Sequence, residues 1–252
     1  MPSIKGQNIL VIGGSSGIGF AVAKLAAAEG VNVSIASSNA SRVSAAVAKL
    51  LAAAPGASIR GYTVDVSHDD VESQLEKLFT DVVAAAGQAL DHIVYTAAVL
   101  DVRPVSAVSA AYLRDSLRFG YVAPLLIAKL SPRFVKQAYT SSLIFTSGRI
   151  AERPVKGMTV AAGVGAALSG ITRGLALDLA PVRANLVSPG ATDTEMLGEG
   201  EAREKMVAYM TQAALLGKIG TPEEVAEAYV YLMKDSNSTG SCVSTSGGVL
   251  VQ

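Results

Sequence analysis

The chain has 252 residues, of which 50% are hydrophobic and 17% are charged, and its basic and acidic residues are equal in number. This balance is typical of a folded globular protein and lacks the compositional signs of disorder. A formal net charge of zero gives no electrostatic footprint for nucleic acid or an anionic membrane, so we expect neither as a partner.

Cysteine and histidine are scarce. Cys242 is the single cysteine, which excludes an intrachain disulfide framework, and His68 and His92 are the only histidines. No spacing resembles a zinc site, and we predict no metal. The N-terminus has no basic segment followed by an apolar run, and we find no window with the roughly eighteen apolar residues of a membrane span. We therefore expect a cytoplasmic protein.

Short runs rich in Val and Ile alternate with longer, Ala-rich amphipathic segments, a pattern typical of βα units. We predict strands near residues 8–13, 31–36, 59–64, 91–96, 142–147, 183–187 and 241–245. We predict helices near residues 17–29, 41–53, 69–86, 109–137, 158–179 and 222–233. The pattern indicates one doubly wound α/β domain over residues 1–252, with a seven-stranded parallel sheet covered by helices on both faces. Segment 193–218 is the only large irregular insertion that we expect, and it is a candidate substrate lid.

The first predicted strand leads into a glycine-rich turn, NILVIGGSSGIGF. Its glycines form a GxxxGxG pattern between a buried strand and a helix. In that context backbone N–H groups and the helix N-terminus can approach a pyrophosphate without a Cβ in the way. The alternative is that the glycines serve only the turn and helix–sheet packing. The predicted dinucleotide contacts in this turn are Gly13, Ser15, Ser16, Gly17, Ile18 and Gly19.

The end of the second predicted strand indicates which dinucleotide binds. An acidic residue there would bind the 2′-hydroxyl of NAD, but this chain has Ser37, Ser38, Asn39 and Arg42. Hydroxyl, amide and guanidinium groups suit a 2′-phosphate, so we predict NADP(H) as the cofactor. The same residues are also compatible with an ordinary polar helix N-terminus that Ser41 caps.

The segment YTVDVSHDD follows the third predicted strand and contributes two further candidates. Asp65 and Val66 follow the strand directly, where Asp65 can face the edge of the adenine. Asp65 can equally be an acid that stabilises the turn.

Taken together with YTAA at 95–98, LIFTSG at 143–148, SPGATDTEM at 188–196 and TSGGVLV at 245–251, these segments resemble the short-chain dehydrogenase/reductase family over essentially the whole chain. The resemblance implies a Rossmann-like fold, a nicotinamide cofactor, and a homodimer or homotetramer built on the long helices. Ser147 matches the family's active-site serine, and Thr194 matches the threonine that holds the nicotinamide carboxamide. The other cofactor contacts that the resemblance implies are Thr96, Ala97, Ala98, Pro189, Gly190 and Thr192.

The chain departs from the family at its YxxxK motif. Alignment on GITRGLALDLA places Ala161 at the tyrosine and Gly165 at the lysine, whereas the usual distance from the active-site serine places Val160 and Val164 there. Both catalytic side chains are missing in either alignment. The family's asparagine in the preceding long helix, which belongs to its proton relay, matches Arg118.

Two kinds of chemistry remain open without that tyrosine. Ser147 and Arg118 can polarise a carbonyl while water supplies the proton, although Arg118 can instead form an ion pair between helices. Alternatively, an iminium substrate accepts hydride without a proton donor and would favour a nearby carboxylate such as Asp101 or Glu152. Three arginines at the same rim favour a polar or anionic substrate group, or are simply surface charges: Arg103, Arg149 and Arg153.

The function that we predict is an NADPH-dependent reductase of a small-molecule carbonyl or imine, with a non-standard active site and a place in secondary metabolism. Divergent members of the family that lack YxxxK include imine reductases and proteins that promote cyclisation in alkaloid assembly. The alternatives are a non-redox cyclase or isomerase that retains NADP(H), and an inactive cofactor-binding protein.

Overall fold

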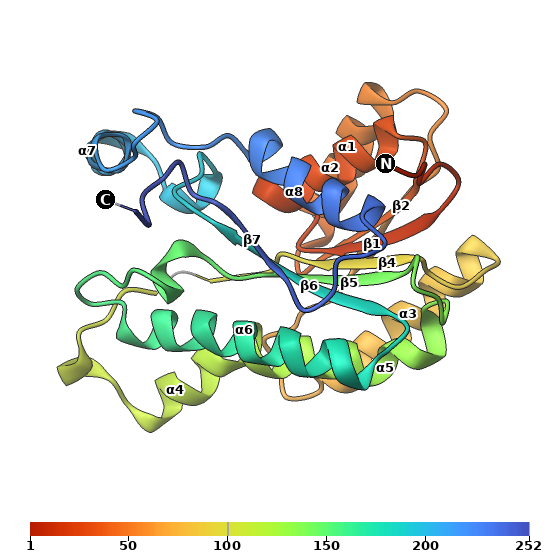
Figure 1. Ribbon diagram of the computed structural model, residues 1–252, viewed down its shortest axis with the longest axis horizontal. Coiled ribbons are helices and arrows are strands. Elements are labelled where there is room, and N and C mark those ends of the chain that lie inside the picture. The colour runs from red at the N-terminus through yellow and green to blue at the C-terminus, as the bar shows by residue number, and fades with distance from the viewer. Residues whose placement is uncertain (100, 252) are drawn as a thin grey trace.

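The computed structural model describes residues 1–99 and 101–251. Its centre is one parallel sheet with the strand order β3-β2-β1-β4-β5-β6-β7 (Figure 1). Each strand lies within about two residues of its predicted position, and the predicted fold class is confirmed. The strands are β1 (Asn8–Ile12), β2 (Asn32–Ser37), β3 (Ile59–Thr63), β4 (His92–Tyr95), β5 (Ser142–Thr146), β6 (Arg183–Pro189) and β7 (Cys242–Thr245).

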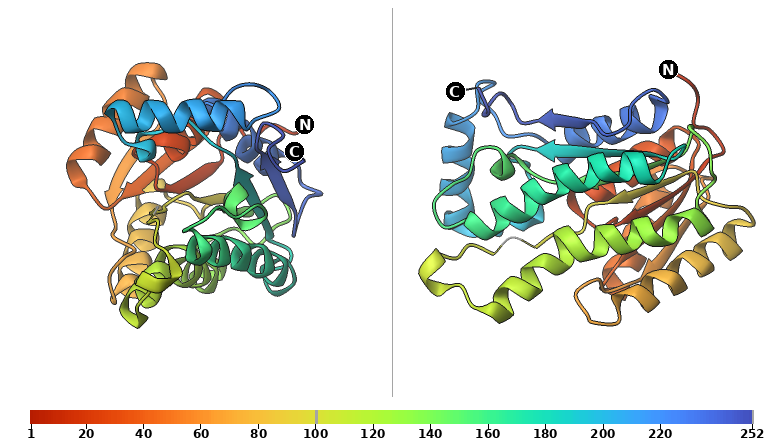
Figure 2. Two further views of the ribbon diagram at one scale, coloured as in Figure 1. Left: turned by 90° about the vertical axis from the view of Figure 1, so that its left-hand side faces the viewer. Right: turned by 60° about the horizontal axis from the view of Figure 1, so that its bottom comes forward.

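Helices cover both faces of the sheet. One face carries α1 (Gly17–Ala28), α2 (Ala40–Ala53) and α8 (Pro222–Lys234), and the opposite face carries α3 (Val71–Ala86), α4 (Ala110–Leu117), α5 (Ala123–Phe134) and α6 (Thr159–Asp178) (Figures 1 and 2). Helix α8 begins with a capping box between Thr221 and Glu224.

The core consists of two apolar clusters, one on each side of the sheet, because successive side chains of a strand point to opposite faces. In β1, Leu10 and Ile12 belong to the cluster beneath α3, α5 and α6, whereas Ile9 and Val11 belong to the cluster beneath α1 and α8. Neighbouring strands β1 and β4 mark the point where the chain changes direction across the sheet. Open α/β sheets bind ligands beyond the carboxyl ends of their strands at such a point.

Two predicted segments need correction. The single helix expected over 109–137 is divided into α4 and α5 by a π-helical turn, η2 (Arg118–Val122), and it ends at Phe134. The lid is not irregular, because it contains the short helix η4 (Glu195–Leu197) and the helix α7 (Gly200–Gln212). Helix α7 buries none of its residues, so its sequence lacks the apolar periodicity by which a helix is predicted.

The sequence led us to expect no segment long and apolar enough to span a membrane, and helix α6 is an exception. By length and composition alone it could cross a membrane, and 22% of the qualifying window is buried inside the protein. A core helix of a folded domain passes the same test. Here Leu168, Thr172 and Leu175 of α6 are buried.

A buried polar network lies at the amino ends of the central strands. His92 is fully buried, with Nδ1 2.8 Å from the Ser142 hydroxyl and Nε2 2.8 Å from Oε1 of Gln7. A neutral ring satisfies both partners when Nε2 donates to Gln7 and Nδ1 accepts from Ser142. Burial, together with the smaller effect of the positive charges of Arg183 and Lys136, lowers the pKa of His92 to about 3.

Acid is expected to destabilise the protein through His92. Because the pKa is lower in the folded protein than in the unfolded chain, the unfolded chain takes up the proton first as the pH falls below about 6.5. The free energy of unfolding then falls by about 1.4 kcal/mol per pH unit on account of this group alone. Urea unfolding at pH 5.5 and 4.5 should show a drop that is larger by about this amount in the wild type than in His92→Asn. Equal drops in the two proteins would contradict the assignment.

Candidate functional site

The glycine turn between β1 and α1 has the geometry that close approach of a ligand requires. Gly13 has φ +93° and Gly17 has φ +51°, both in the left-handed region that favours glycine. A Cβ on Gly19 would lie 2.3 Å from the carbonyl oxygen of Gly13. Ser16 is the N-cap of α1 but makes no side-chain capping bond, so the first amides of the helix are available to an anion. The predicted turn residues thus lie together.

Thr96 supports this turn from the neighbouring strand. Its N–H donates to the carbonyl of Ile12 at 2.8 Å, and its hydroxyl donates to the same carbonyl at 3.2 Å. A Cβ on Gly13 would lie 2.6 Å from the Thr96 hydroxyl oxygen. Thr96, with Ala97 and Ala98 after it, therefore lines the sheet edge beside the glycine turn.

The residues after β2 form the start of α2. Asn39 is the N-cap: its side-chain oxygen accepts from the Arg42 N–H at 2.9 Å and from the Ser41 hydroxyl at 2.7 Å. The alternative that Ser41 caps this helix is therefore wrong. Ser37 and Ser38 precede the cap, and Arg42 is exposed on the first turn. The four candidates for a 2′-phosphate site thus occupy one strand end and one helical turn.

Asp65 stabilises the turn after β3. Its Oδ1 accepts from the N–H of Ser67 at 2.9 Å and from the Ser67 hydroxyl at 2.6 Å. The Ser67 hydroxyl lowers the pKa of Asp65 below its usual value. Val66 is buried. The turn role proposed as an alternative for Asp65 is therefore present, and the adenine contact stays a prediction.

Ser147 lies beside one of the two candidate lysine positions. It follows β5, and its hydroxyl donates to the carbonyl of Gly165 at 2.9 Å. A Cβ on Gly165 would lie 3.1 Å from that hydroxyl oxygen, whereas the side chain of Val164 packs against Gly120 in η2. Positions 161 and 165 share one helix face. The assignment of Ala161 and Gly165 to the tyrosine and lysine positions stays a prediction.

The guanidinium of Arg118 bonds to the turn after β3 and to α4. It donates to the carbonyl of Ser67 at 2.9 Å and pairs with Asp69 at 2.7 Å and with Asp115, three residues before it, at 3.3 Å. Arg118 thus forms ion pairs, as the alternative from the sequence expected, but they connect it to a turn and to the end of its own helix and not to a second helix. The catalytic role of Arg118 stays a prediction.

The segment after β6 reaches across to the glycine turn. The Gly190 N–H donates to the carbonyl of Thr245 at 3.0 Å after Pro189, and the Thr192 hydroxyl donates to the Gly190 carbonyl at 3.1 Å. The Thr194 methyl carbon would lie 3.1 Å from a Cβ on Gly17. Thr194 therefore lies beside the glycine turn, and its contact with the nicotinamide carboxamide stays a prediction.

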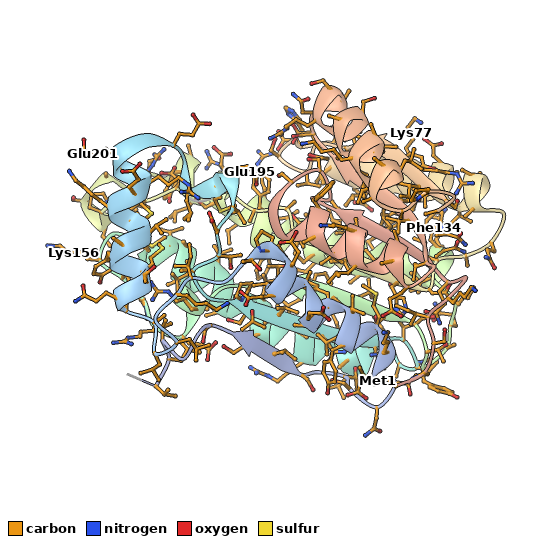
Figure 3. All side chains as sticks on the ribbon, turned by 90° about the horizontal axis from the view of Figure 1, so that it is seen from above. Met1, Lys77, Phe134, Lys156, Glu195 and Glu201 are labelled. Atoms are coloured by element: carbon orange, nitrogen blue, oxygen red, sulfur yellow. The ribbon has the colours of Figure 1, made fainter. Side chains whose placement is uncertain are left out.

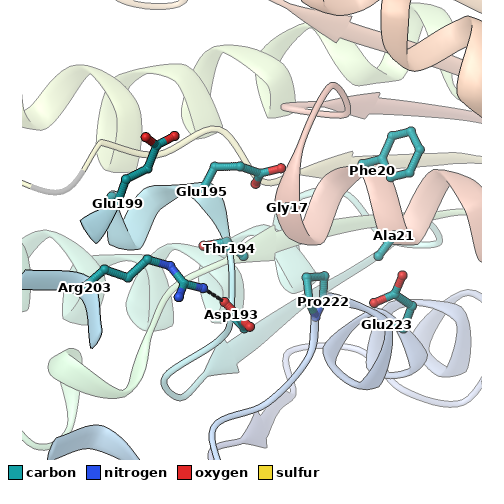
Figure 4. Close-up of a pocket in the computed structure, with 11 residues that line it drawn as sticks. Gly17, Phe20, Ala21, Asp193, Thr194, Glu195, Glu199, Arg203, Pro222 and Glu223 are labelled. Carbon is teal, nitrogen blue, oxygen red and sulfur yellow. Dashed lines mark hydrogen bonds and ion pairs between the residues drawn. The ribbon is translucent and has the colours of Figure 1, made fainter. Parts of the chain in front are cut away.

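The lid stands off the body of the protein beyond Thr194. A cavity of about 450 Å³ separates it from the first turns of α1 and α8, and an ion pair between Arg203 and Asp193 crosses from α7 to the segment after β6 (Figure 4). Figure 3 shows Glu195, on η4 of the lid, between α7 and the body, and Glu201 on α7 at the periphery. The Arg203–Asp193 pair was not predicted from the sequence. Helix α7 has no buried face, so its sequence does not show which of its residues contact the segment after β6.

The charged loop residues that were candidates for substrate contacts mostly have partners within the protein. Asp101 pairs with Arg103 at 2.9 Å, and the Arg103 guanidinium stacks over the ring of Tyr112 at 4.2 Å. Glu152 accepts a hydrogen bond from Ser188 at 3.2 Å, and Arg153 donates to the carbonyl of Val249. These contacts weaken the expectation of an anionic substrate.

Comparison with known proteins agrees with this geometry. Over 253 residues and the full length of both chains, the protein is 51% identical to short-chain dehydrogenase/reductase ATR9 of Stachybotrys chlorohalonatus. The solved structure of MalC reductase/Diels-Alderase from Malbranchea aurantiaca superimposes with a TM-score of 0.94 at 36% identity, covering 99% of this chain and 98% of that one.

A more distant solved structure was determined with a cofactor. The blue fluorescent protein from a metagenomic library, in complex with NADPH, gives a TM-score of 0.86 at 26% identity, covering 98% of this chain and 99% of that one. The family model of the SDR-like Rossmann domain matches residues 3–252. The chain therefore belongs to the short-chain dehydrogenase/reductase family and is an oxidoreductase of that type.

Proposed function

We propose that the protein is an NADPH-dependent reductase of a small-molecule carbonyl or imine that works without the tyrosine–lysine pair of its family. The glycine turn carries this proposal, because the absence of a Cβ at Gly13 and Gly19 leaves a backbone cradle closed on one side by Thr96. Backbone amides at a helix N-terminus bind the diphosphate of a dinucleotide. The residues present therefore fit the cofactor that the family implies.

The choice of NADPH rests on the end of β2. Residues 37–42, SSNASR, include an arginine and no carboxylate that would repel a 2′-phosphate. The NADPH bound to the blue fluorescent protein is consistent with this choice within the same fold.

Arg42→Ala is expected to weaken binding of NADPH by about tenfold or more and to leave binding of NADH unchanged, because a charge-assisted hydrogen bond contributes about 1.5–3 kcal/mol. Titration calorimetry with both cofactors measures this difference. Lys49→Ala is the matched control, since it removes an exposed positive charge from the same helix. Equal weakening of both cofactors in Arg42→Ala would argue against a 2′-phosphate contact.

The missing tyrosine limits the chemistry that the chain's own residues can perform. When bound, the nicotinamide supplies hydride to an electrophilic carbon. A general acid typically contributes a factor of about 10²–10⁴ in rate, and Ala161 and Gly165 cannot provide one. The Ser147 hydroxyl, at the carboxyl end of β5, can polarise a carbonyl after it turns from Gly165. An iminium substrate needs no proton, because hydride addition converts it directly to a neutral amine.

A second candidate function is catalysis of a cyclisation in the same pocket. The observation that favours it is the similarity to MalC, which is described as a reductase/Diels-Alderase. Ala161 and Gly165 also place no large side chain beside Ser147, where even a Cβ on Gly165 would lie 3.1 Å from the Ser147 hydroxyl oxygen and 3.2 Å from the Ala151 Cβ.

The two functions differ in their use of NADPH. The test is to mix the protein and NADPH with a panel of ketones, cyclic imines and iminium salts, and to follow both absorbance at 340 nm and product formation. Oxidation of NADPH in step with product identifies the reductase. Product without an absorbance change identifies the cyclase and excludes the reductase for that substrate.

We also propose that the protein forms a homodimer or homotetramer through α4, η2 and α6. Neighbouring helices α4 and α6 lie on one side of the sheet (Figure 2). Large apolar residues on α4, η2 and α6 are exposed to solvent. The exposed fraction is 41% for Leu113, 42% for Tyr121 and 82% for Leu177. A second copy of the chain would cover this surface.

Light scattering at micromolar concentration should give a mass of about two or four times the 25.7 kDa of one chain. Leu177→Arg should lower that mass by placing a charge in the proposed interface. A mass of 25.7 kDa for the wild type would contradict the proposal.

A further inference from the structure

Arg118 occupies an unusual piece of backbone. It is the first residue of the π-helical turn η2, where the N–H of Ala123 donates to the carbonyl of Arg118. The buried hydroxyl of Tyr95, at the end of β4, donates to the Phe119 carbonyl at 2.8 Å and fixes this turn against the sheet. A π-helical turn inserts an extra residue, and this changes the direction in which the neighbouring side chains leave the helix.

The guanidinium of Arg118 bridges two separate elements. Nη1 donates to the Ser67 carbonyl and Nη2 pairs with Asp69, both after β3, while Nε pairs with Asp115 on α4. The Arg118 side chain is 23% exposed, whereas that of Asp69 is 95% exposed. Because exposed ion pairs contribute little, the bond to the Ser67 carbonyl is the main link to the turn.

Ser67 connects this link to the proposed cofactor site. Its N–H and hydroxyl both donate to Asp65, and the N–H of Asp65 donates to Oε1 of Gln74 on α3. The carbonyl of Ser67 is therefore held by Arg118, while its N–H and hydroxyl hold Asp65. Both sets of bonds therefore act on segment 65–69.

We propose that Arg118 is a positioning residue that holds segment 65–69 ready for the adenine half of the dinucleotide. This inference rests on the proposed cofactor function. A loop that is already ordered binds more tightly, because the ligand does not have to supply the entropy of ordering it. Arg118 thus acts on cofactor affinity through Ser67 and does not touch the reacting atoms.

The experiment measures binding of the two halves of the cofactor separately. Adenosine 2′,5′-bisphosphate and ADP represent the adenine half, and nicotinamide mononucleotide represents the other half. In Arg118→Ala, the Kd for both adenine probes should rise by about tenfold, while the Kd for nicotinamide mononucleotide stays unchanged. Arg118→Lys should recover part of the affinity, because an ammonium group can still donate to the Ser67 carbonyl.

Two further variants serve as controls. Arg114→Ala removes an exposed arginine from α4, one turn before Arg118, and should leave both adenine probes unaffected. Asp115→Asn removes an exposed ion pair of Arg118 outside segment 65–69 and should change the Kd by less than about twofold. Hydrogen exchange of the Ser67 N–H in the unliganded protein gives an independent measure, and it should become faster in Arg118→Ala and partly slower again in Arg118→Lys.

Unchanged adenine affinity in folded Arg118→Ala would overturn this inference while leaving the proposed function in place. If turnover were lost at the same time, Arg118 would instead act on the substrate. Failure of the wild type to bind NADPH, NADH or either adenine probe would overturn the proposed function together with this inference.

Discussion

Gly19→Ala is expected to weaken NADPH binding by about 100-fold or more while the sheet remains folded, because displacing the turn breaks backbone hydrogen bonds to the diphosphate, and one hydrogen bond to a charged group contributes about 1.5–3 kcal/mol. The new Cβ would lie 2.3 Å from the Gly13 carbonyl oxygen and 2.5 Å from the Thr96 hydroxyl oxygen. Neither atom is the end of a flexible side chain, so the turn itself must move. Alanine is otherwise the better helix former by about 1 kcal/mol, so helix propensity cannot cause the loss.

Gly174→Ala provides the matched control for this prediction. Gly174 is also a helical glycine, but it has open space around its Cβ position. NADPH titration should give the wild-type Kd for this variant, and thermal melting of both unliganded variants shows that they are folded. A Kd within about twofold of the wild type for Gly19→Ala would contradict the account of the glycine turn.

Arg183→Met is expected to lower the free energy of unfolding by about 3 kcal/mol or more, because each buried acceptor that loses its donor costs about 1–3 kcal/mol. The guanidinium is 3% exposed and donates to the carbonyls of Tyr139, Leu232, Met233 and Ser238. Two of these carbonyls belong to the last turn of α8, where a positive charge also interacts favourably with the helix dipole. Methionine would leave four acceptors without this donor, two of them in buried hydrogen bonds.

Urea denaturation at neutral pH measures this loss. Arg183→Lys should lose less than Arg183→Met, because its ammonium group can still reach some of the carbonyls. Arg173→Met is the control and should change stability by less than about 0.5 kcal/mol, since Arg173 is exposed and donates to Ser169 within α6. A loss below about 1 kcal/mol in Arg183→Met would show that the network does not support the fold.

The sequence was sufficient to predict the sheet, because strands of a parallel sheet are buried on both faces and appear as short apolar runs such as LIF in β5. The glycine turn was equally readable, since the conformation of Gly13 and the crowding at Gly19 depend on local spacing. Helix α7 was missed for the converse reason. It buries no side chain, and its periodicity therefore carries no signal.

The direction of single side chains could not be read in the same way. Arg118 matches a family position by spacing, but its guanidinium donates to the carbonyl of Ser67, a contact between distant segments that no local pattern records. Likewise, spacing alone left two alignments of the lost motif, and it could not show that the Ser147 hydroxyl donates to the carbonyl of Gly165. The contact of Arg103 with the Tyr112 ring depends on the conformation of the loop between them. The partner of Arg153 is the carbonyl of Val249, far away in the sequence. A local sequence pattern records neither contact.

Direct titration of the wild-type protein with NADPH and NADH, in one preparation and at one salt concentration, is the measurement on which the account depends most. We predict one binding site per chain, with NADPH bound about tenfold or more tightly than NADH. Equal affinities would contradict the assignment of Ser37, Ser38, Asn39 and Arg42 to a 2′-phosphate. No binding of either dinucleotide would contradict the proposed function itself.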